Sequence, residues 1–479
     1  MMLGLDIGTG SVKAVALSEQ GKIIWSSQRE LPSLLMDNGR VEFDADVWFN
    51  TVAELVREFS SHFKPTFLRM CIGGQAPSIV PVSSDGEPLA RAIVWMDGRA
   101  VKEAERLRKT FGEEVDAFTA ESKLLWIKEN MPTLYQKTRY FLHCFDYVSF
   151  RLTGVASVGI LDEGYFTWES IPYWVPSHLE AMGFDVSKLP EPRLIGNEIG
   201  IIKPEMADLL KIPRGTVVVQ GTVDFAQSIL GVGVVEPGLA MDHGGTSQGF
   251  DLCWDKKLEP KSREFNCVKH VVKGYWNVSG VMNTTGAVYR WFKNNFYPAD
   301  AKYSLVDAEA AASEPCRLIV LPYFQGERTP IWNPYARGVF FGLTLKHSRG
   351  DLARAILEAT AFGLRRIKDA IENAGGKTSE IRVAGGQAKS DVWNQIKADV
   401  LGVRIVKTQM DECSPLGAAL LASVSEGLYR DLKYAASKVV KIEKVYEPDL
   451  RHKELYDHFY ELYIDLYDSV KKLFPRFIF

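Results

Sequence analysis

Residues 4–25 of the chain read GLDIGTGSVKAVALSEQGKIIW. Apolar residues alternate up to Ile7, stop over Gly8–Ser11 and resume over Val12–Leu17, a pattern typical of two strands joined by a tight turn. Glycine permits a positive φ and lets another group approach the backbone closely, and the run adds two hydroxyl side chains. The stretch therefore predicts a β-hairpin whose turn binds an anion, with an ordinary hairpin turn as the alternative.

The same pattern returns in residues 238–254, GLAMDHGGTSQGFDLCW, where a glycine and hydroxyl turn again separates two apolar runs. Aligning the two turns on Gly8 and Gly245 gives a spacing of 237 residues, about half of the 479-residue chain. This spacing indicates a duplication. The Gly- and Pro-containing stretch at 231–238 marks a boundary, so we predict two domains, residues 1–237 and 238–479.

The length of 479 residues also favours two hydrophobic cores over one. The formal net charge is −3, and no basic stripe is present, so neither a nucleic acid nor a membrane is expected as a partner. Six scattered cysteines without a CxxC pair indicate neither a zinc site nor a disulfide framework. No apolar run has membrane-spanning length and no signal peptide is evident, so we expect a cytoplasmic protein with a small-molecule partner.

Strand-like and helix-like runs alternate along both halves of the chain, which is typical of α/β proteins. The expected strands lie at 68–73, 92–95, 217–220, 317–321 and 381–383, and the expected helices at 101–110, 124–129, 351–374, 392–401 and 415–427. Residues 453–474 carry aromatic side chains at helical spacing and predict a C-terminal helix that covers a core, with a ligand-binding role for these aromatics as the alternative.

Two glycine turns, one in each domain, suggest that both hold one polyphosphate. Phosphoryl transfer also needs a metal near a carboxylate and a base for the attacking hydroxyl. Asp6 lies just before the first turn and is expected to hold Mg²⁺ through water, unless it only bonds its own turn. A third glycine turn, in residues 384–393, follows a strand and opens a helix, where nucleotides commonly bind.

Asp224 is the candidate general base. It follows the apolar strand at 217–220 and opens the next helix, near the sheet edge where α/β proteins bind ligands. An Asp at this place is also a common helix N-cap, and the local sequence leaves that alternative open.

These motifs together resemble the FGGY family of carbohydrate kinases over residues 3–447. Residues 338–358, GVFFGLTLKHSRGDLARAILE, satisfy the long C-terminal signature of that family with its fixed gap. A second signature is met across residues 118–130 except at Ala120, where Pro, Ser or Thr is expected. The resemblance implies two duplicated ribonuclease-H-like domains of the actin and hexokinase type with a cleft between them, ATP-dependent phosphorylation of a sugar, and ATP and Mg²⁺ as cofactors.

The resemblance also implies roles for individual residues. Asp6 would lie near the metal, and Asp224 would take the proton from the sugar hydroxyl. The nucleotide would be bound by Gly8, Thr9, Gly10, Ser11, Gly245, Thr246, Gly286, Gly385, Gly386 and Ser390. Lys13 is included as a phosphate contact, with a solvated strand lysine as the alternative.

The implied substrate residues lie in two substrate segments, residues 75–78 and 95–99, and at Phe118, Asp224 and Phe225. In the first segment, Gln75 is followed by Ala76 and Pro77, where glycerol kinases carry Arg-Glu and xylulokinases Met-His. Other short motifs of the chain are closer to those of xylulokinases than to those of glycerol kinases. A ketopentose such as xylulose is therefore the expected substrate, with another ketose, a polyol or an aldonate as alternatives.

Two polar residues of the second segment, Asp97 and Arg99, are expected to grip sugar hydroxyls, or else to form a surface ion pair. Phe118 is expected to face the sugar or to pack in the core.

The cleft would close over sugar and ATP and exclude water, and the candidate assembly is a homodimer. The rival functions are an actin-fold ATPase or binding module and an inactive regulator on the kinase fold.

Overall fold

The structure is a computed structural model that describes residues 1–37, 39–112, 115–163 and 174–477. The chain forms two compact units. Unit 1 comprises Met1–Gly233, Lys269–Lys273 and Cys413–Val439, and unit 2 comprises Val234–Val268, Gly274–Glu412 and Val440–Phe479. The predicted domains, residues 1–237 and 238–479, stay a prediction. The compact units differ from them in that the C-terminal segment Cys413–Val439 packs with the N-terminal half of the chain.

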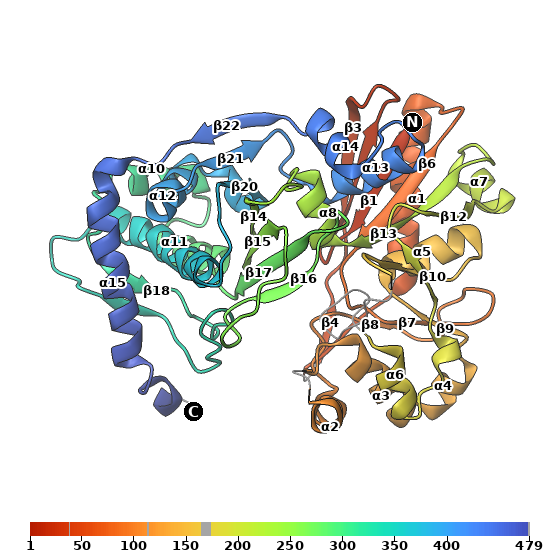
Figure 1. Cartoon of the computed structure of the whole chain (residues 1–479), viewed down its shortest axis with the longest axis horizontal. Coiled ribbons are helices and arrows are strands. Elements are labelled where there is room, and N and C mark those ends of the chain that lie inside the picture. The colour runs from red at the N-terminus through yellow and green to blue at the C-terminus, as the bar shows by residue number, and fades with distance from the viewer. Residues whose placement is uncertain (38, 113–114, 164–173, 478–479) are drawn as a thin grey trace. The chain divides into compact units, whose positions relative to one another are not determined.

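Unit 1 is built on a six-stranded sheet with the order β12-β13-β6-β1-β2-β3 (Figure 1). Its three central neighbours, β13, β6 and β1, are parallel, and the flanking pairs are antiparallel. The strands are β1 (Met2–Ile7), β2 (Ser11–Leu17), β3 (Ile23–Glu30), β6 (Arg69–Gly74), β12 (Glu198–Ile201) and β13 (Val217–Val223). The apolar runs of β1 and β13 are buried over their full length, as expected for central strands of a sheet covered on both faces.

Unit 2 contains a second large sheet with the order β17-β15-β14-β20-β21-β22, extended by β16 (Asn266–Lys269) beside β17. Its strands are β14 (Leu239–Gly244), β15 (Gln248–Trp254), β17 (Trp276–Met282), β20 (Glu380–Ala384), β21 (Ile405–Thr408) and β22 (Ile442–Tyr446). The pairs β14–β20 and β20–β21 are parallel, and the other described pairs are antiparallel.

The two sheets share one pattern of strand directions and the order of five strands. Reading outward from each hairpin, β3-β2-β1-β6-β13 of unit 1 corresponds to β17-β15-β14-β20-β21 of unit 2, and an antiparallel edge strand follows in each sheet. The edge strands differ in chain order, because β12 precedes β13 whereas β22 follows β21. The two glycine turns occupy the same place in both sheets, between β1 and β2 and between β14 and β15. The duplication predicted from the turn spacing and the α/β fold class predicted from the alternation of strands and helices are therefore confirmed.

Smaller strands complete the two units: β4 (Leu35–Asp37), β5 (Arg40–Phe43), β7 (Val80–Val82), β8 (Ala92–Ile93), β9 (Tyr140–Leu142), β10 (Ser157–Ile160), β11 (Glu191–Leu194), β18 (Ile319–Leu321) and β19 (Val339–Phe341). The helices of unit 1 are α1 (Ala45–Phe63), α2 (Val101–Phe111), α3 (Ala120–Asn130), α4 (Pro132–Lys137), α5 (Cys144–Thr153), α6 (Pro176–Ala181), α7 (Pro204–Leu210), α8 (Asp224–Gly231), α13 (Ser414–Ser425) and α14 (Leu432–Val439). Those of unit 2 are α9 (Gly286–Phe296), α10 (Tyr303–Ala312), α11 (Arg349–Asn373), α12 (Asp391–Leu401) and α15 (Lys453–Val470).

Helix α13 lies against β1 although the two are near opposite ends of the chain, as the blue helix beside the red strand in Figure 1 shows. The approach is close enough to require glycine: a Cβ at Gly4 would lie 1.9 Å from the carbonyl oxygen of Pro415. On α13 itself, a Cβ at Gly417 would lie 2.0 Å from the carbonyl oxygen of Gln227 in α8. These contacts explain why α13 belongs to unit 1.

The C-terminal helix packs as predicted, but it ends at Val470 rather than near Phe474. It buries four tyrosines at helical spacing against the core of unit 2, namely Tyr456, Tyr460, Tyr463 and Tyr467. The prediction that these aromatics serve packing is confirmed.

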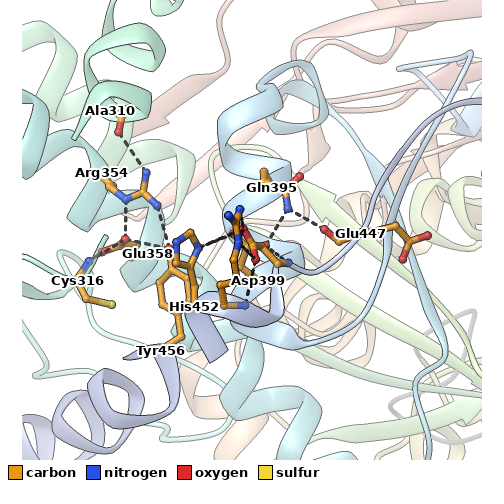
Figure 2. Close-up of polar contacts among 11 residues, drawn as sticks. Ala310, Cys316, Arg354, Glu358, Gln395, Asp399, Glu447, His452 and Tyr456 are labelled. Carbon is orange, nitrogen blue, oxygen red and sulfur yellow. Dashed lines mark hydrogen bonds and ion pairs between the residues drawn. The ribbon is translucent and has the colours of Figure 1, made fainter. Parts of the chain in front are cut away.

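Figure 2 shows how Glu358, the last residue of the long signature motif, ties this helix to the core. Its carboxylate accepts hydrogen bonds from Arg354 Nε at 2.9 Å, from the Tyr456 hydroxyl at 3.2 Å and from the backbone N–H of Cys316 at 3.2 Å. Burial raises the pKa of Glu358, and the Arg354 guanidinium opposes that rise. In unit 2 this signature residue therefore serves the fold.

Among the described residues, no helix is long and apolar enough to cross a membrane. All six cysteines are buried and free of disulfides.

Candidate active site

The first turn connects β1 to β2 and is closed by a hydrogen bond of 3.0 Å from the Gly8 N–H to the Ser11 carbonyl. Neither Gly8 nor Gly10 has a positive φ, so that part of the reasoning on glycine was wrong. Glycine instead leaves space: a Cβ at Gly10 would have no neighbour within 4 Å, and one at Gly8 would lie 3.1 Å from the Ser11 carbonyl oxygen. The turn thus presents bare backbone, as an anion-binding turn requires.

Thr9 links this turn to both substrate segments. The Trp95 indole donates a hydrogen bond of 3.0 Å to Thr9 Oγ1, and the Thr9 hydroxyl donates one of 3.3 Å to Gln75 Oε1. Gln75 is 2% exposed, and its amide nitrogen Nε2 is buried without a hydrogen-bond partner among the residues that the structure describes. A buried, unpaired amide donor carries a free-energy cost that a ligand oxygen would remove.

Asp6 lies near the end of β1 and is 5% exposed. Its Oδ1 accepts a hydrogen bond of 2.8 Å from the hydroxyl of Ser414, the first residue of α13. Lys13 lies opposite Asp6 in the antiparallel register of β1 and β2 and is half-buried. Its contact with a phosphate stays a prediction.

Asp224 is the first residue of α8, and Val223 holds the N-cap position. The alternative that Asp224 is the N-cap itself is therefore wrong. One of its oxygens accepts a hydrogen bond of 2.7 Å from the backbone N–H of Phe225. The predicted strand before it is confirmed and extends three residues further, to Val223, because the run through Gly221 and Thr222 remains buried.

Strand register brings Asp6 and Asp224 to the same edge of the unit 1 sheet. Asp6 is opposite Gly73 in the parallel pair β1–β6, and Val223 is opposite Gly74 in the parallel pair β13–β6. Two strand spacings separate β1 from β13, which is about 10 Å. Gln75, the residue after β6, lies between them at this edge.

Asp97 and Arg99 form an ion pair, as the alternative expected, but the pair is buried. Asp97 is 0% exposed, and Arg99 Nε and Nη2 donate to its two oxygens at 2.8 and 2.7 Å. Arg99 Nη2 also lies 2.7 Å from Glu42 Oε1, and its guanidinium carbon lies 4.8 Å from the Trp126 ring centroid. These hydrogen bonds hold the second substrate segment in place, and a direct contact with sugar hydroxyls stays a prediction.

The apolar substrate candidates differ in exposure. Phe118 is 48% exposed, which rules out the core-packing alternative for this side chain. Phe225 and Ala76 are partly buried against the core of unit 1, and Pro77 is half-buried. A contact of any of the four with sugar stays a prediction.

In unit 2, five of the six predicted nucleotide residues line one cavity of about 400 Å³, namely Gly245, Thr246, Gly286, Gly386 and Ser390. The sixth, Gly385, lies beside it with φ +80°, a conformation that favours glycine. Gly286 is required by close approach, because a Cβ there would lie 2.1 Å from the Gly245 carbonyl oxygen. The Ser390 hydroxyl caps α12 by accepting a hydrogen bond from the Trp393 N–H at 3.3 Å.

The comparisons with known proteins agree with this geometry. The family descriptions "FGGY family of carbohydrate kinases, N-terminal domain" and "C-terminal domain" match residues 1–231 and 243–426. The chain belongs to the FGGY family of carbohydrate kinases. Members of this family of sugar kinases use ATP as the phosphoryl donor.

Three relatives of this FGGY kinase span nearly its whole length. The xylulose kinase of Bacillus subtilis (strain 168) is 27% identical, covering 98% of this chain and 97% of the relative. The gluconokinase of Bacillus licheniformis is 27% identical, covering 89% and 88%. The crystal structure of ligand-bound xylulose kinase from Lactobacillus acidophilus has a TM-score of 0.89 at 26% identity, covering 100% and 99%.

Sequence reasoning on this FGGY kinase missed Gln387, which joins the third turn to the second. Its Nε2 donates to the Gly245 carbonyl at 3.2 Å and to Thr285 Oγ1 at 2.8 Å, and its Oε1 accepts from Lys397 Nζ at 3.3 Å. Lys397 also pairs with the buried Asp242 carboxylate at 2.5 Å. Gly245 and Thr285 lie 142 and 102 residues away from Gln387, so no local pattern could have found these two contacts.

It also missed the aromatic wall of the cavity. Tyr289, Tyr303 and Trp393 line it, with the Tyr289 ring 5.7 Å from Tyr303 and 5.2 Å from Trp393 between centroids. The only sequence signal was the place of Tyr289 three residues after Gly286. Lys389 and Arg290 add cationic groups to the same cavity.

The last residue that was missed as part of the site is Lys123, although it belongs to the second signature. Its side chain is 0% exposed, and Nζ donates to the carbonyls of Pro77, Val94 and Trp95 at 3.1, 2.9 and 2.9 Å. Burial lowers the pKa of this ammonium to about 7, against an opposing effect of the Asp97 and Asp116 carboxylates.

Proposed function

We propose that this FGGY kinase transfers the γ-phosphoryl group of Mg²⁺-bound ATP to a hydroxyl of a ketopentose such as xylulose, giving a sugar phosphate and ADP. Xylulose kinases at 25–29% identity over nearly the full chain support the substrate class. A cytoplasmic location, where ATP is available, belongs to the same proposal.

One observation carries the proposal for the chemistry. The parallel strands β1, β6 and β13 end at one edge of the unit 1 sheet and are followed there by the first turn, Gln75 and Asp224. Ligands of α/β sheets bind at the carboxyl edge of the strands. An anion-binding turn, an unpaired amide donor and a carboxylate at one edge are the groups that phosphoryl transfer to an alcohol needs.

Asp224 would act as the general base. A carboxylate at the start of a helix is favoured in its charged form by the helix dipole, and the Phe225 N–H holds one of its oxygens. The other oxygen would accept the proton of the sugar hydroxyl as that hydroxyl attacks the γ-phosphorus atom. Bond formation at the hydroxyl oxygen is matched by cleavage of the bond to the β-phosphate oxygen, which leaves with ADP.

Mg²⁺ fits the chemistry of the Asp6 carboxylate. No group of three or more His, Cys, Asp or Glu gathers into a metal site in the described parts of the chain. Mg²⁺ usually keeps several waters and binds through one or two carboxylates together with substrate phosphates. Asp6 would therefore hold the ion through water, and the ion would neutralise phosphate charge. The bond from Ser414 fixes the direction of the carboxylate.

In unit 2, the cavity of about 400 Å³ would bind the adenosine part of ATP. Its aromatic side chains offer an apolar wall for the adenine ring. The Gly245 and Thr246 backbone would meet the phosphates, and Lys389 and Arg290 would add positive charge.

The buried ion pair of Asp97 and Arg99 favours a neutral sugar over an aldonate. An aldonate carries a carboxylate and needs a cation with donors to spare. Arg99, the cation among the proposed substrate residues, already binds Asp97 and Glu42. An aldonate remains the second candidate because a gluconokinase is among the relatives.

The test is ADP release from Mg²⁺-bound ATP with a panel of pentuloses, hexuloses, polyols and aldonates and a control without sugar. Strong stimulation by a pentulose supports the proposal, and stimulation by an aldonate alone replaces the substrate class. Hydrolysis of ATP at the same rate with and without every sugar would overturn it. The same preparation, analysed by light scattering, tests the predicted homodimer.

A further inference from the structure

Lys123 lies on α3 with its ammonium group buried among backbone carbonyls. An ammonium has three N–H donors, and each of the three carbonyls of Pro77, Val94 and Trp95 accepts one of them. Hydrogen bonds to a charged donor are stronger than those between neutral groups. The ammonium is thus fully paired, and it joins three backbone points that are distant in sequence.

Two of those points belong to the two substrate segments, and the third, Val94, directly precedes the second segment. Pro77 lies in the segment 75–78, and Val94 and Trp95 lie where the segment 95–99 begins. Trp95 in turn donates from its indole to Thr9 of the first turn. One side chain therefore fixes the separation of the two substrate segments and, through Trp95, their position relative to the first turn.

The packing of α3 gives no reason for a charge at this place. The helix already buries Ala120, Leu124 and Leu125 against an apolar cluster of unit 1. Burying an ammonium costs free energy, and an apolar side chain of similar length often stabilises a core as well or better. What Lys123 provides and an apolar residue does not is the fixed geometry of the two segments.

We propose that Lys123 is a positioning residue that sets the affinity for the sugar by holding the two substrate segments in register with the first turn. The inference rests on the proposed sugar site of unit 1, and it adds a residue that acts through others and does not touch the substrate.

Lys128 provides a matched control on the same helix. It is also a partly buried lysine, but its Nζ donates to the carbonyl of Met182 at 2.8 Å, outside the substrate segments. Lys123→Met is expected to raise KM for the sugar about 10- to 100-fold, as for the loss of hydrogen bonds to a charged group, and to leave KM for ATP unchanged. Lys128→Met is expected to leave both constants unchanged.

Lys123→Gln is a second variant in case Lys123→Met does not fold. Its amide keeps two donors on a shorter side chain, so its KM for the sugar should lie between those of the wild type and Lys123→Met. A lower melting temperature with an unchanged KM for the sugar in either variant would mean a purely structural role and would overturn the inference.

Hydrogen–deuterium exchange separates this inference from the proposed function. Amide exchange at residues 75–79 and 94–97 should be faster in the Lys123 variants than in the wild type and in Lys128→Met. If no sugar stimulates the wild type, the proposed function fails while the exchange result still decides whether Lys123 holds the segments. Unchanged exchange there would overturn the inference whatever the kinetics show.

Discussion

Ser414 donates a hydrogen bond of 2.8 Å to Asp6 although the two residues are 408 positions apart in the chain. The hydroxyl also lies 3.2 Å from Gln227 Oε1 of α8. The N-terminus of α13 thus orients the carboxylate that we propose for Mg²⁺. This contact depends on the close approach of α13 to β1, which Gly4 makes possible.

Ser414→Ala is therefore expected to weaken the use of Mg²⁺. The variant loses one hydrogen bond to a carboxylate, which is worth about 1.5–3 kcal/mol for a charged acceptor. We expect a higher Mg²⁺ concentration for half-maximal rate and an unchanged melting temperature within a few degrees. Ser423→Ala is the control, because Ser423 on the same helix donates to the Ala419 carbonyl at 2.7 Å, within α13 itself. Equal Mg²⁺ dependence in both variants would contradict the role of Ser414.

Asp224→Asn is expected to lower turnover about 10²- to 10⁴-fold, the usual contribution of a positioned general base. The amide cannot accept the hydroxyl proton, yet it can still accept the hydrogen bond from the Phe225 N–H, so the fold of α8 should persist. Nucleotide affinity, measured by calorimetry, should stay the same. Asp208→Asn replaces an exposed carboxylate of unit 1 that pairs with Arg214 and serves as the control. Wild-type turnover in Asp224→Asn would exclude Asp224 as the base.

Much of the fold could be predicted from the sequence because its strongest signals are local. A glycine turn between two alternating apolar runs is visible within about 15 residues, and its recurrence near Gly245 revealed the duplication. The capping box of α11, in which the side chains of Ser348 and Asp351 bond each other's backbone N–H, is a further local signal, and it places the beginning of that helix at Arg349 rather than at the predicted residue 351.

The assignment of α13 to unit 1 could not be predicted in this way. The same holds for the hydrogen bonds by which Lys123 joins the two substrate segments. Gly4 and Gly417 look like ordinary glycines in a strand and a helix, and only the approach of the two elements explains them. The role of Lys123 could not be predicted because its three acceptors are backbone carbonyls, which carry no sequence signature. Contacts between remote segments decide both features.

Gly286→Ala is expected to impair nucleotide binding. The new Cβ would lie 2.1 Å from the Gly245 carbonyl oxygen, far inside contact distance, so the second turn or the start of α9 must shift. Overpacking of this kind costs about 1–3 kcal/mol, which corresponds to a rise of about 5- to 150-fold in KM for ATP if it falls on the binding geometry. Gly215→Ala is the control, since its Cβ would have no neighbour within 4 Å and its φ is not positive. The same KM for ATP in both variants would contradict this account of Gly286.

The stability of the wild type relative to Lys123→Met is expected to depend on pH. Burial lowers the pKa of Lys123 from 10.5 to about 7 in the folded protein. Below pH 7 both the folded and unfolded chains carry the proton, and the folded state bears the full cost of the buried charge. Between about pH 7 and 10 the unfolded chain binds more protons than the folded one, so the free energy of unfolding of the wild type rises with pH, by at most about 1.4 kcal/mol per pH unit.

The Met variant lacks this titration, so the free energy of unfolding of the wild type minus that of Lys123→Met should increase from pH 7 to pH 10. Urea unfolding of both proteins at several pH values measures the difference, and Lys128→Met provides the control, for which the difference from wild type should change less. The groups that face Lys123 and titrate or carry charge are Asp97, Asp116 and Arg99. A difference that is independent of pH would show that Lys123 keeps its proton throughout, held by its three carbonyl partners.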